Sequence, residues 1–402
     1  MSTESVEHRP EDVLDEAVNQ GNLAFAVAAF GTSEGQSWAY AAGHRDANKR
    51  HSANPDNIVQ IASMTKLVTS IAALQLVERG LLALDEPADV YLAELAKLRV
   101  LTGFDASGKG QFEDARRAPT ARELITHTAG FVYEMWNKNE QRAVTTGLAE
   151  SFLGEGNFLV NPLAFQPATQ WEYGTNTDWL GLLIEQRSGE RLADYFEKNI
   201  FDPLGMTDTY FELPKDKLDR SVAMMARAEE QIVASSFAQP VSRDRHSMPF
   251  YSGGGGLYST VDDYGRVLQM LLRAGSVNGS QVLSAKTVDD MFQNHIGELR
   301  PSALVTQIPQ VSNTADLAFG APATFGLGLL IHPDGLPGGR RANTGSWAGL
   351  FNTYYWVDRE SDLYGIFGTQ ILPFYDAAAV STLAQFEQAV YSDRSVYTAV
   401  RA

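Results

Sequence analysis

Segments with strand character lie near both ends of this 402-residue sequence, and a long stretch with a different pattern separates them. Residues 84–248 are rich in turn-forming residues and short amphipathic stretches, which predicts helices and long loops. The predicted strands are residues 23–30, 36–42, 326–331, 351–357 and 363–369. This arrangement predicts an α/β (α+β) fold in which residues 1–83 and 249–402 form one discontinuous domain and residues 84–248 form a helical domain. We expect the functional site in the cleft between them.

Helices are indicated where apolar residues recur at helical spacing between capping signals. The predicted helices are residues 10–19, 64–79, 177–187, 192–199, 264–272 and 376–391. Thr120 and Glu123 have the spacing of a capping box, and Thr260 is placed to cap the helix that follows it. Gly80 is expected to end the helix that starts near Met64.

Composition restricts the chemistry available to the chain. The 49 acidic and 32 basic residues give a net charge of −17, which argues against a nucleic acid partner because phosphate binding requires clustered Lys and Arg. The sequence has no cysteine, so a nucleophile must be an oxygen or a nitrogen. The seven histidines lack the spacing of metal ligands, and we expect neither a metal nor a cofactor.

The start of the chain has no signal-peptide pattern, because residues 1–13 lack a basic segment followed by an apolar one. The most apolar helical run, residues 67–77, is too short to cross a bilayer. We therefore expect a cytoplasmic protein without a membrane span.

Ser63 and Lys66 stand at the start of the predicted helix over residues 64–79. A spacing of three places both side chains on the same helical face, within reach of each other. The positive potential of a helix N-terminus disfavours the ammonium form, so Lys66 can take part in proton transfer, and a serine beside such a lysine can attack an acyl carbon. Chance alone gives about half a Ser-x-x-Lys match in such a chain, so a capping serine followed by a solvent-exposed lysine is the alternative.

Gly31, Ser33 and Gly35 form a second serine motif, because they match the Gly-x-Ser-x-Gly pattern of a nucleophile elbow. An elbow requires a helix after the serine, whereas residues 36–42 alternate as a strand does. We therefore predict that Ser33 lies in a hairpin turn.

Three further features have both structural and functional interpretations. Tyr173 lies in a loop before a predicted helix, where tyrosine usually packs or caps, but beside a lysine ammonium its phenol could act as a base. Residues 253–256 are four glycines without the Lys-Ser/Thr of a phosphate loop, which predicts close backbone packing. His127 ends a predicted helix, where contact with a carbonyl is the ordinary role.

In chain order, these motifs resemble those of one enzyme superfamily. They are Ser63-x-x-Lys66, His127-Thr-Ala-Gly130, Tyr173, Pro203-Leu-Gly-Met206, Ser252 to Thr260 and Trp347-Ala-Gly349. From about Asn22 to Tyr391 the chain resembles the class C β-lactamase-like serine hydrolases, which include serine DD-peptidases and the family VIII carboxylesterases. The resemblance implies an antiparallel sheet flanked by helices plus a mostly helical domain. It also implies Ser63 as nucleophile, Lys66 as its hydrogen-bonded partner and Tyr173 as general base.

Departures from the common motifs favour the family VIII esterases within this superfamily. β-Lactamases and peptidases usually have Asn two positions after the tyrosine, where this chain has Thr175. Their third motif has Lys or His near a substrate carboxylate. The esterase-like Trp-Gly-Gly motif falls on Trp347, Ala348 and Gly349, and Asn343-Thr-Gly345 is the alternative register; neither has the cation. The resemblance therefore implies neutral esters as substrates.

By the same resemblance, the oxyanion hole consists of the backbone N–H groups of Ser63 and Leu350. The residues expected to line the substrate pocket are Tyr133, Trp136, Phe250, Trp347 and Gly349, with Trp171 and Tyr251 as further aromatic candidates. Each aromatic residue, taken singly, also fits an ordinary core position.

These features predict a serine carboxylesterase that hydrolyses small to medium neutral esters through an acyl-enzyme on Ser63. The expected partner is therefore a small-molecule ester. β-Lactamase, DD-peptidase and acyltransferase activities at the same site are the alternatives within the enzyme class. A catalytically inactive binding protein on the same fold is the alternative outside it.

Overall fold

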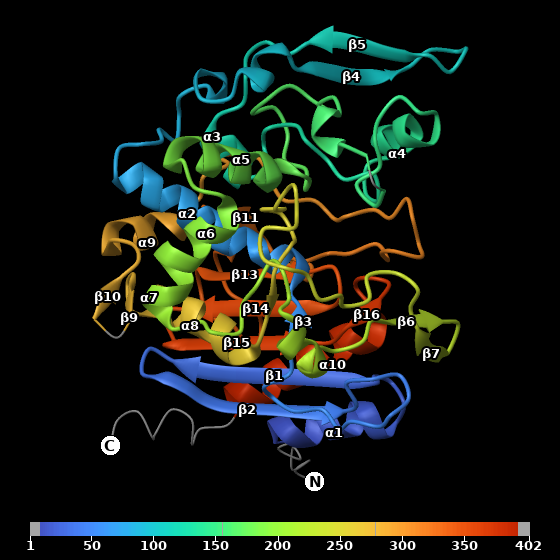
Figure 1. Cartoon of the computed structure of the whole chain (residues 1–402), viewed down its shortest axis with the longest axis vertical. Coiled ribbons are helices and arrows are strands. Elements are labelled where there is room, and N and C mark those ends of the chain that lie inside the picture. Colours follow the sequence, from blue (N-terminus) through green and yellow to red (C-terminus); the bar gives the residue numbers. More distant parts are fainter. Residues whose placement is uncertain (1–8, 155, 278, 393–402) are drawn as a thin grey trace.

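A seven-stranded antiparallel sheet forms the centre of the computed structural model, which describes residues 9–154, 156–277 and 279–392 (Figure 1). The strands follow the order β11-β12-β13-β14-β15-β1-β2. They are β1 (Phe25–Thr32), β2 (Gly35–Gly43), β11 (Thr324–Phe325), β12 (Leu330–His332), β13 (Thr344–Gly349), β14 (Thr353–Asp358) and β15 (Leu363–Gly368). Because β1 pairs with β15, strands from the two ends of the chain complete one sheet. The predicted antiparallel sheet flanked by helices is confirmed.

Helices surround this sheet and occupy much of the chain between β2 and β11. They are α1 (Pro10–Asn19), α2 (Thr65–Glu78), α3 (Ala121–Ile125), α4 (Lys138–Thr145), α5 (Asn176–Ser188), α6 (Leu192–Phe196), α7 (Asp202–Leu204), α8 (Val261–Leu272), α9 (Ala285–Met291) and α10 (Ala377–Ser392). Shorter turns are the 3₁₀ segments η1 (Ala62–Met64), η2 (Ala88–Val90), η3 (Ala93–Lys97), η4 (Phe158–Val160) and η6 (Lys215–Arg220), and the π-helical η5 (Glu197–Phe201). Each predicted helix is present, and the one expected over residues 192–199 continues from α6 into η5.

The helices cover both faces of the sheet. Consecutive residues of β14 point to opposite faces, as side chains along a strand do. The Tyr355 ring packs against Tyr264 of α8, whereas Trp356 packs against Phe386 of α10. With both faces covered, β1, β14 and β15 are buried along their whole length. This explains why the sequence of β1 is a continuous run of apolar residues without alternating polar ones.

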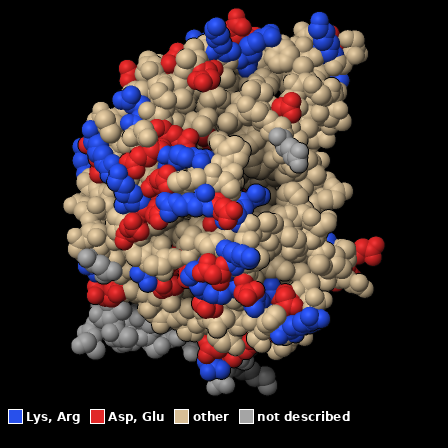
Figure 2. Space-filling model, in the orientation of Figure 1, with Lys and Arg blue, Asp and Glu red and all other residues tan. Residues whose placement is uncertain are grey.

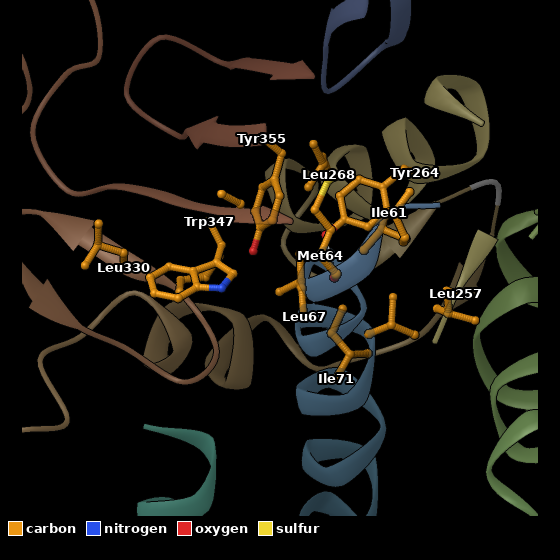
Figure 3. Packing of buried hydrophobic residues seen from close by; sticks show 14 of the residues in the cluster. Ile61, Met64, Leu67, Ile71, Leu257, Tyr264, Leu268, Leu330, Trp347 and Tyr355 are labelled. Atoms are coloured by element: carbon orange, nitrogen blue, oxygen red, sulfur yellow. Dashed lines mark hydrogen bonds between the residues drawn. The ribbon is translucent and has the colours of Figure 1, made fainter. Parts of the chain in front are cut away.

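α2 lies in the interior, and its residues are buried from Thr65 to Leu76. A helix buried all round carries apolar residues on every face. Figure 3 shows Trp347 and Tyr355 near Met64 and Leu67 at the start of this helix. α5 packs against α2 as well. Gly80, with a φ of +69°, follows the end of α2 as predicted.

The segment over residues 84–248, predicted to form helices and long loops, also contains two β-hairpins. β4 (Arg99–Phe104) pairs with β5 (Gly110–Asp114) in a hairpin that has little apolar alternation to indicate it; Val100 and Leu101 of β4 are buried, whereas β5 is largely exposed. β6 (Met225–Ala228) pairs with β7 (Gln231–Ala234) and also with the distant strand β16 (Ile371–Leu372), a contact that a local pattern cannot show. A further short pair is β9 (Ser276–Val277) with β10 (Ser280–Gln281).

The predicted strand over residues 326–331 is wrong in its first part. Residues 326–329 form the turn between β11 and β12, closed by a hydrogen bond from the Gly326 N–H to the Leu329 carbonyl (2.8 Å), and only the last two predicted residues belong to β12. β13 was not predicted, because three of its six residues are Gly or Ala, which have low strand propensity. It forms because it is paired on both sides, with β12 and β14.

Basic and acidic side chains lie next to one another on the face shown in Figure 2. Ion pairs among the described residues include Arg245 with Asp194 and Glu197, and Arg220 with Asp208. Within residues 9–392, gaps at 155 and 278 excepted, no helix has both the length and the apolar character needed to cross a membrane.

The capping box of α3 is present as predicted. The Thr120 hydroxyl accepts a hydrogen bond from the Glu123 N–H (3.2 Å), and the Glu123 carboxylate accepts one from the Thr120 N–H (2.9 Å). We expect Thr120→Ala to lower the free energy of unfolding by about 1 kcal/mol, because a helix N–H loses its partner. Thr120→Ser keeps the hydroxyl and should lose much less. Urea unfolding measures both variants, and equal losses would contradict the capping role.

Candidate active site

The backbone before Ser63 is fixed by pairing with a distant segment. β3 (Val59–Gln60) pairs with β8 (Tyr258–Ser259), and the Ile61 N–H donates a hydrogen bond to the Leu257 carbonyl (3.0 Å). The chain then turns into η1 and α2, so the start of α2 is held against the segment that follows the four glycines.

Ser63 itself lies in this turn. Ala62 has a φ of +44°, a costly conformation for a residue with a side chain that persists only where the surroundings impose it. On the other side, the Tyr264 hydroxyl donates a hydrogen bond to the Met64 carbonyl (2.9 Å). Ala62 and Met64 are buried, whereas Ser63 is half-buried and keeps contact with solvent.

Lys66 lies in the first turn of α2, and only 3% of the residue is exposed. Its Nζ donates hydrogen bonds to the Ser63 hydroxyl (3.2 Å), the Tyr133 hydroxyl (3.0 Å) and the Gly254 carbonyl (2.6 Å). The alternative of a solvent-exposed lysine is therefore wrong. Burial lowers the pKa of Lys66 to about 7, and the Asp178 carboxylate acts in the opposite direction. Lys66 can thus hold or release a proton near neutral pH.

Tyr173 approaches Ser63 from the loop before α5, and it is buried. Its hydroxyl hydrogen-bonds with Ser63 and accepts a hydrogen bond from the Trp347 indole N–H (3.3 Å). The Lys66 Nζ lies 4.8 Å from the centroid of the Tyr173 ring. Burial raises the pKa of Tyr173 above its ordinary value of 10, and the hydrogen bonds with Ser63 and Trp347 act in the opposite direction. The structure therefore brings together Ser63, Lys66 and Tyr173.

Two residues predicted to line the substrate pocket belong to this same cluster. Tyr133 is buried, and its hydroxyl accepts the hydrogen bond from Lys66 Nζ. Burial raises the pKa of Tyr133 well above 10. Trp136 lies with its ring centroid 5.5 Å from that of Tyr173, and its indole N–H donates to the Ser312 hydroxyl (2.9 Å). Sequence reasoning missed the contact between Tyr133 and Lys66, because nothing local links two residues 67 positions apart.

A row of aromatic rings leads from this cluster towards the surface. The distances between successive ring centroids are 5.3 Å from Tyr173 to Tyr133, 4.7 Å to Phe152, 5.0 Å to Phe158 and 6.2 Å to Phe250. The first two rings are buried and the last three are half-buried. Phe250, another predicted substrate-binding residue, thus lies at the outer end of the row.

Two other aromatic candidates lie outside the row. The Tyr251 hydroxyl donates a hydrogen bond to Glu212 (3.1 Å), and its ring packs on Phe211 with the centroids 5.0 Å apart. Trp171 is buried against Phe325. Both occupy core positions, which was the ordinary interpretation of such residues.

The C-terminal half of β13 lies beside the Ser63 turn. Trp347 is in ring contact with Tyr173, with the centroids 4.9 Å apart. A Cβ on Gly349 would lie 2.3 Å from the Ile61 carbonyl oxygen, so only glycine allows this approach. The Leu350 side chain packs against a small buried cluster that includes Ala62.

The third motif could also be aligned on Asn343-Thr-Gly345, and these residues lie at the other end of β13. The Asn343 N–H donates to the His332 carbonyl (2.8 Å), and the Thr344 hydroxyl donates to the Arg341 carbonyl (2.7 Å). Gly345 faces Phe292 rather than the Ser63 turn. The segment from Trp347 to Gly349 is therefore the part of β13 that adjoins the candidate site.

His127 is buried beside Tyr173, which corrects its interpretation as an ordinary helix end. The two ring centroids are 4.8 Å apart. The Asn176 Nδ2 lies 3.1 Å from His127 Nδ1 and donates to the Phe131 carbonyl (2.9 Å). Burial lowers the pKa of His127 well below 6.5, so the ring is neutral and Nδ1 accepts this hydrogen bond. The Asn176 amide nitrogen is therefore bonded within the protein and is unavailable to a substrate.

The glycine loop over residues 253–256 packs closely, as predicted. A Cβ on Gly253 would lie 2.6 Å from the Thr177 carbonyl oxygen, and a Cβ on Gly254 would lie 2.5 Å from Asp178 Oδ2. The Thr69 hydroxyl donates to the Gly253 carbonyl (2.6 Å). The loop is thus bonded to α2 through Thr69 and Lys66, and it contacts α5 through Thr177 and Asp178.

Ser33 lies in the turn between β1 and β2, which confirms its prediction as a hairpin residue. Its hydroxyl donates a hydrogen bond to the Asp362 carboxylate (2.8 Å). Because a strand and not a helix follows it, Ser33 is not in a nucleophile elbow.

Comparison with known proteins identifies the family. Residues 13–389 match the β-lactamase family. The chain belongs to the β-lactamase family. Among solved structures, EstCE1, described as a hydrolase with promiscuous acyltransferase activity, shares the fold with a TM-score of 0.75 at 19% identity, covering 96% of this chain and 98% of that one.

Other relatives of this β-lactamase-family chain are named for acyl transfer or ester cleavage. It is 32% identical over 354 residues to monacolin J acid methylbutanoyltransferase of Aspergillus terreus, covering 84% of this chain and 82% of that protein. It is 30% identical over 358 residues to lovastatin esterase of Penicillium rubens, covering 85% of this chain and 87% of that protein. A variant of simvastatin synthase from Aspergillus terreus has a TM-score of 0.80 at 28% identity, and the match covers 96% of this chain and 94% of that one. The chain is an enzyme of the serine hydrolase and acyltransferase class.

Burial of Lys66 predicts a pH dependence of stability. Between the folded-state pKa of about 7 and the ordinary value of 10.5, the unfolded chain binds a proton at Lys66 that the folded chain does not. Stability from this group therefore rises with pH across that window. We expect the free energy of unfolding of the wild type, minus that of Lys66→Met, to increase from pH 7 towards pH 10.5 in urea titrations. Lys97→Met, at an exposed position, is the control variant. If the difference in free energy of unfolding between the wild type and Lys66→Met did not change with pH, the lowered pKa of Lys66 would be contradicted.

Proposed function

We propose that this β-lactamase-family enzyme cleaves neutral carboxylic esters through a covalent acyl intermediate on Ser63. The observation that carries the proposal is the placement of a half-exposed Ser63 hydroxyl between two buried groups that can move its proton, Lys66 at 3.2 Å and Tyr173. A serine hydroxyl is a weak nucleophile until a neighbouring base takes its proton.

The proposed acylation step starts from the form of the site in which Tyr173 has lost its phenol proton and lies as a phenolate beside the Lys66 ammonium. The Ser63 oxygen attacks the ester carbonyl carbon while the Ser63 proton passes to the Tyr173 oxygen. The bond between the carbonyl carbon and the alcohol oxygen then breaks, and Tyr173 returns the proton to the leaving alcohol. The Lys66 ammonium, 4.8 Å from the Tyr173 ring centroid, and the Trp347 N–H both favour the phenolate that accepts the proton. Their effect opposes that of burial, which disfavours the phenolate.

Deacylation is proposed to repeat these steps with water. Tyr173 takes a proton from the water, whose oxygen attacks the acyl carbon, and Ser63 recovers its proton as the carboxylic acid leaves. In both steps, the backbone N–H groups of Ser63 and Leu350 are proposed to donate hydrogen bonds to the oxyanion. The contact of the end of β13 with Ile61 and Ala62 supports this assignment. Each such donor typically contributes about 10²–10³ in rate.

Neutral esters are proposed as the substrate class because the third motif presents Trp347 where β-lactamases and peptidases present Lys or His. The Trp347 N–H is used by Tyr173, and Lys66 is bonded to Ser63, Tyr133 and Gly254. The aromatic row from Tyr133 to Phe250 supports an apolar acyl or alcohol group on the substrate.

The direct test of this proposal is hydrolysis of a p-nitrophenyl ester. We expect Ser63→Ala and Tyr173→Phe each to lower kcat/KM by at least about 10³, because the nucleophile or its proton acceptor is lost. Ser33→Ala is the matched control and should retain activity, since Ser33 is bonded to Asp362 in a surface turn. Full activity of Ser63→Ala or Tyr173→Phe would overturn the mechanism. Nitrocefin turnover at a rate comparable to that of the ester would favour β-lactamase activity instead.

Acyl transfer to an alcohol is the second candidate function. It is favoured by relatives at 32% identity that are named methylbutanoyltransferases. The proposed mechanism accommodates it without a change of residues, because an alcohol can replace water in deacylation. We expect a new ester to accumulate when a primary alcohol is added to the hydrolysis reaction, with the carboxylic acid falling in proportion. Gas chromatography of both products measures this partition, and acid as the sole product at every alcohol concentration would exclude transfer.

A further inference from the structure

We infer that Asp178 is a positioning residue of this site: its carboxylate fixes the glycine loop that binds Lys66 and serves as the counterion that keeps the Lys66 ammonium beside Ser63. The catalytic meaning of this inference rests on the proposed function, in which the charge of Lys66 acts on Tyr173. The arrangement of charges itself can be tested without any turnover.

Asp178 lies in the first turn of α5 and is fully buried. Its Oδ1 accepts hydrogen bonds from the Ser252 hydroxyl (2.6 Å) and from the Gly254 N–H (3.1 Å). The carboxylate thus holds both the residue before the four glycines and the second of those glycines. The first turn of a helix also favours a negative charge.

Gly254 connects Asp178 to Lys66. Its N–H is bonded to Asp178, and its carbonyl accepts the shortest of the three Lys66 hydrogen bonds (2.6 Å). A Cβ at this position would lie 2.5 Å from Asp178 Oδ2, so glycine is required where the loop meets the carboxylate. A displacement of the carboxylate would therefore move the carbonyl that orients the ammonium.

The balance of charge around Lys66 also depends on Asp178. Within the described part of the chain, the titratable groups that face Lys66 are Asp178, Tyr133, Tyr173 and His127. Burial raises the pKa values of both tyrosines and lowers that of His127, so these three groups are neutral near pH 7 in the resting site, before the reactive phenolate of Tyr173 forms. Asp178 is the remaining group that can carry the compensating negative charge.

The second oxygen of the carboxylate, Oδ2, has no hydrogen-bond donor among the described residues. Burial raises the pKa of Asp178, whereas Lys66, Ser252 and the Gly254 N–H act in the opposite direction. An isolated buried ion is unstable, and an opposite charge in the same low-dielectric region stabilises it. Asp178 and Lys66 therefore support each other's ionised forms across Gly254.

Titration of Lys66 by NMR tests this inference in the full-length protein. The chain has nine lysines, so selective ¹³Cε labelling gives few signals, and Lys66→Arg identifies the signal of Lys66. We expect a midpoint near 7 in the wild type and a midpoint lower by about one pH unit or more in Asp178→Asn. The asparagine side-chain oxygen can still accept the hydrogen bonds from Ser252 and Gly254, so this variant removes the charge with little change in shape. An unchanged midpoint would overturn the inference.

Two further variants separate charge from loop geometry. Thr69→Val removes the hydrogen bond to the Gly253 carbonyl but no charge, and we expect it to leave the Lys66 midpoint in place. Ser252→Ala removes one donor from the carboxylate and should lower the midpoint by less than Asp178→Asn does. If Asp178→Asn does not fold, Ser252→Ala decides the question: a lowered midpoint supports the inference, and an unchanged one contradicts it.

Kinetics then connect the charge to catalysis. Part of the pH profile of kcat/KM is set by the titration of Lys66, and in Asp178→Asn we expect this part to move to lower pH. Loss of a purely structural residue would instead lower kcat/KM by the same factor at every pH. The outcome is separable from that of the proposed function. A shifted NMR midpoint in a protein without esterase activity would reject the proposed function and leave the Asp178 interaction standing.

Discussion

The constraint on which the site depends is the burial of the Lys66 amino group among its hydrogen-bond partners and the Asp178 carboxylate. Removing an ammonium from water costs several kcal/mol unless its N–H groups and its charge are compensated. The three partners of Lys66 Nζ are Ser63, Tyr133 and Gly254, which come from three separate parts of the chain. Two of these partners, Tyr133 and Gly254, are distant from Lys66 in the sequence, so the buried lysine depends on the packing of both segments against α2.

The fold supplies these partners through the way its layers are connected. The central sheet is completed by strands from both ends of the chain, and α2 packs in the interior with the segment over residues 84–248 on its other side. The sheet contributes Trp347 and Gly349 through β13, and the intervening segment contributes Tyr133 and Tyr173. The glycine loop has no side chains and can therefore pass between α2 and α5 closely enough for its carbonyl to reach Lys66.

Features that depend on neighbouring residues were predictable from the sequence. The capping box of Thr120 and Glu123, the hairpin around Ser33 and the helix that starts near Met64 all rest on signals within a few positions. The Ser-x-x-Lys spacing likewise placed Ser63 and Lys66 together, and the position of Tyr173 came from the resemblance to a known superfamily.

Features that depend on distant partners were not predictable in the same way. β13 has weak strand propensity and forms because strands pair with it on both sides. The bond between Tyr133 and Lys66, the burial of His127 and the link from Asp178 through Gly254 join residues far apart in sequence. The same limit applies to the hairpin of β6 and β7, which is completed by β16.

The central claim is that Ser63 is the nucleophile, and covalent labelling tests it most directly. The folded wild-type protein is treated with a fluorophosphonate probe, and the modified residue is located by peptide mass spectrometry. We predict a single adduct on the peptide that contains Ser63, with no adduct in Ser63→Ala. An adduct on the Ser33 peptide, or a folded wild-type protein that takes up no probe, would contradict the claim.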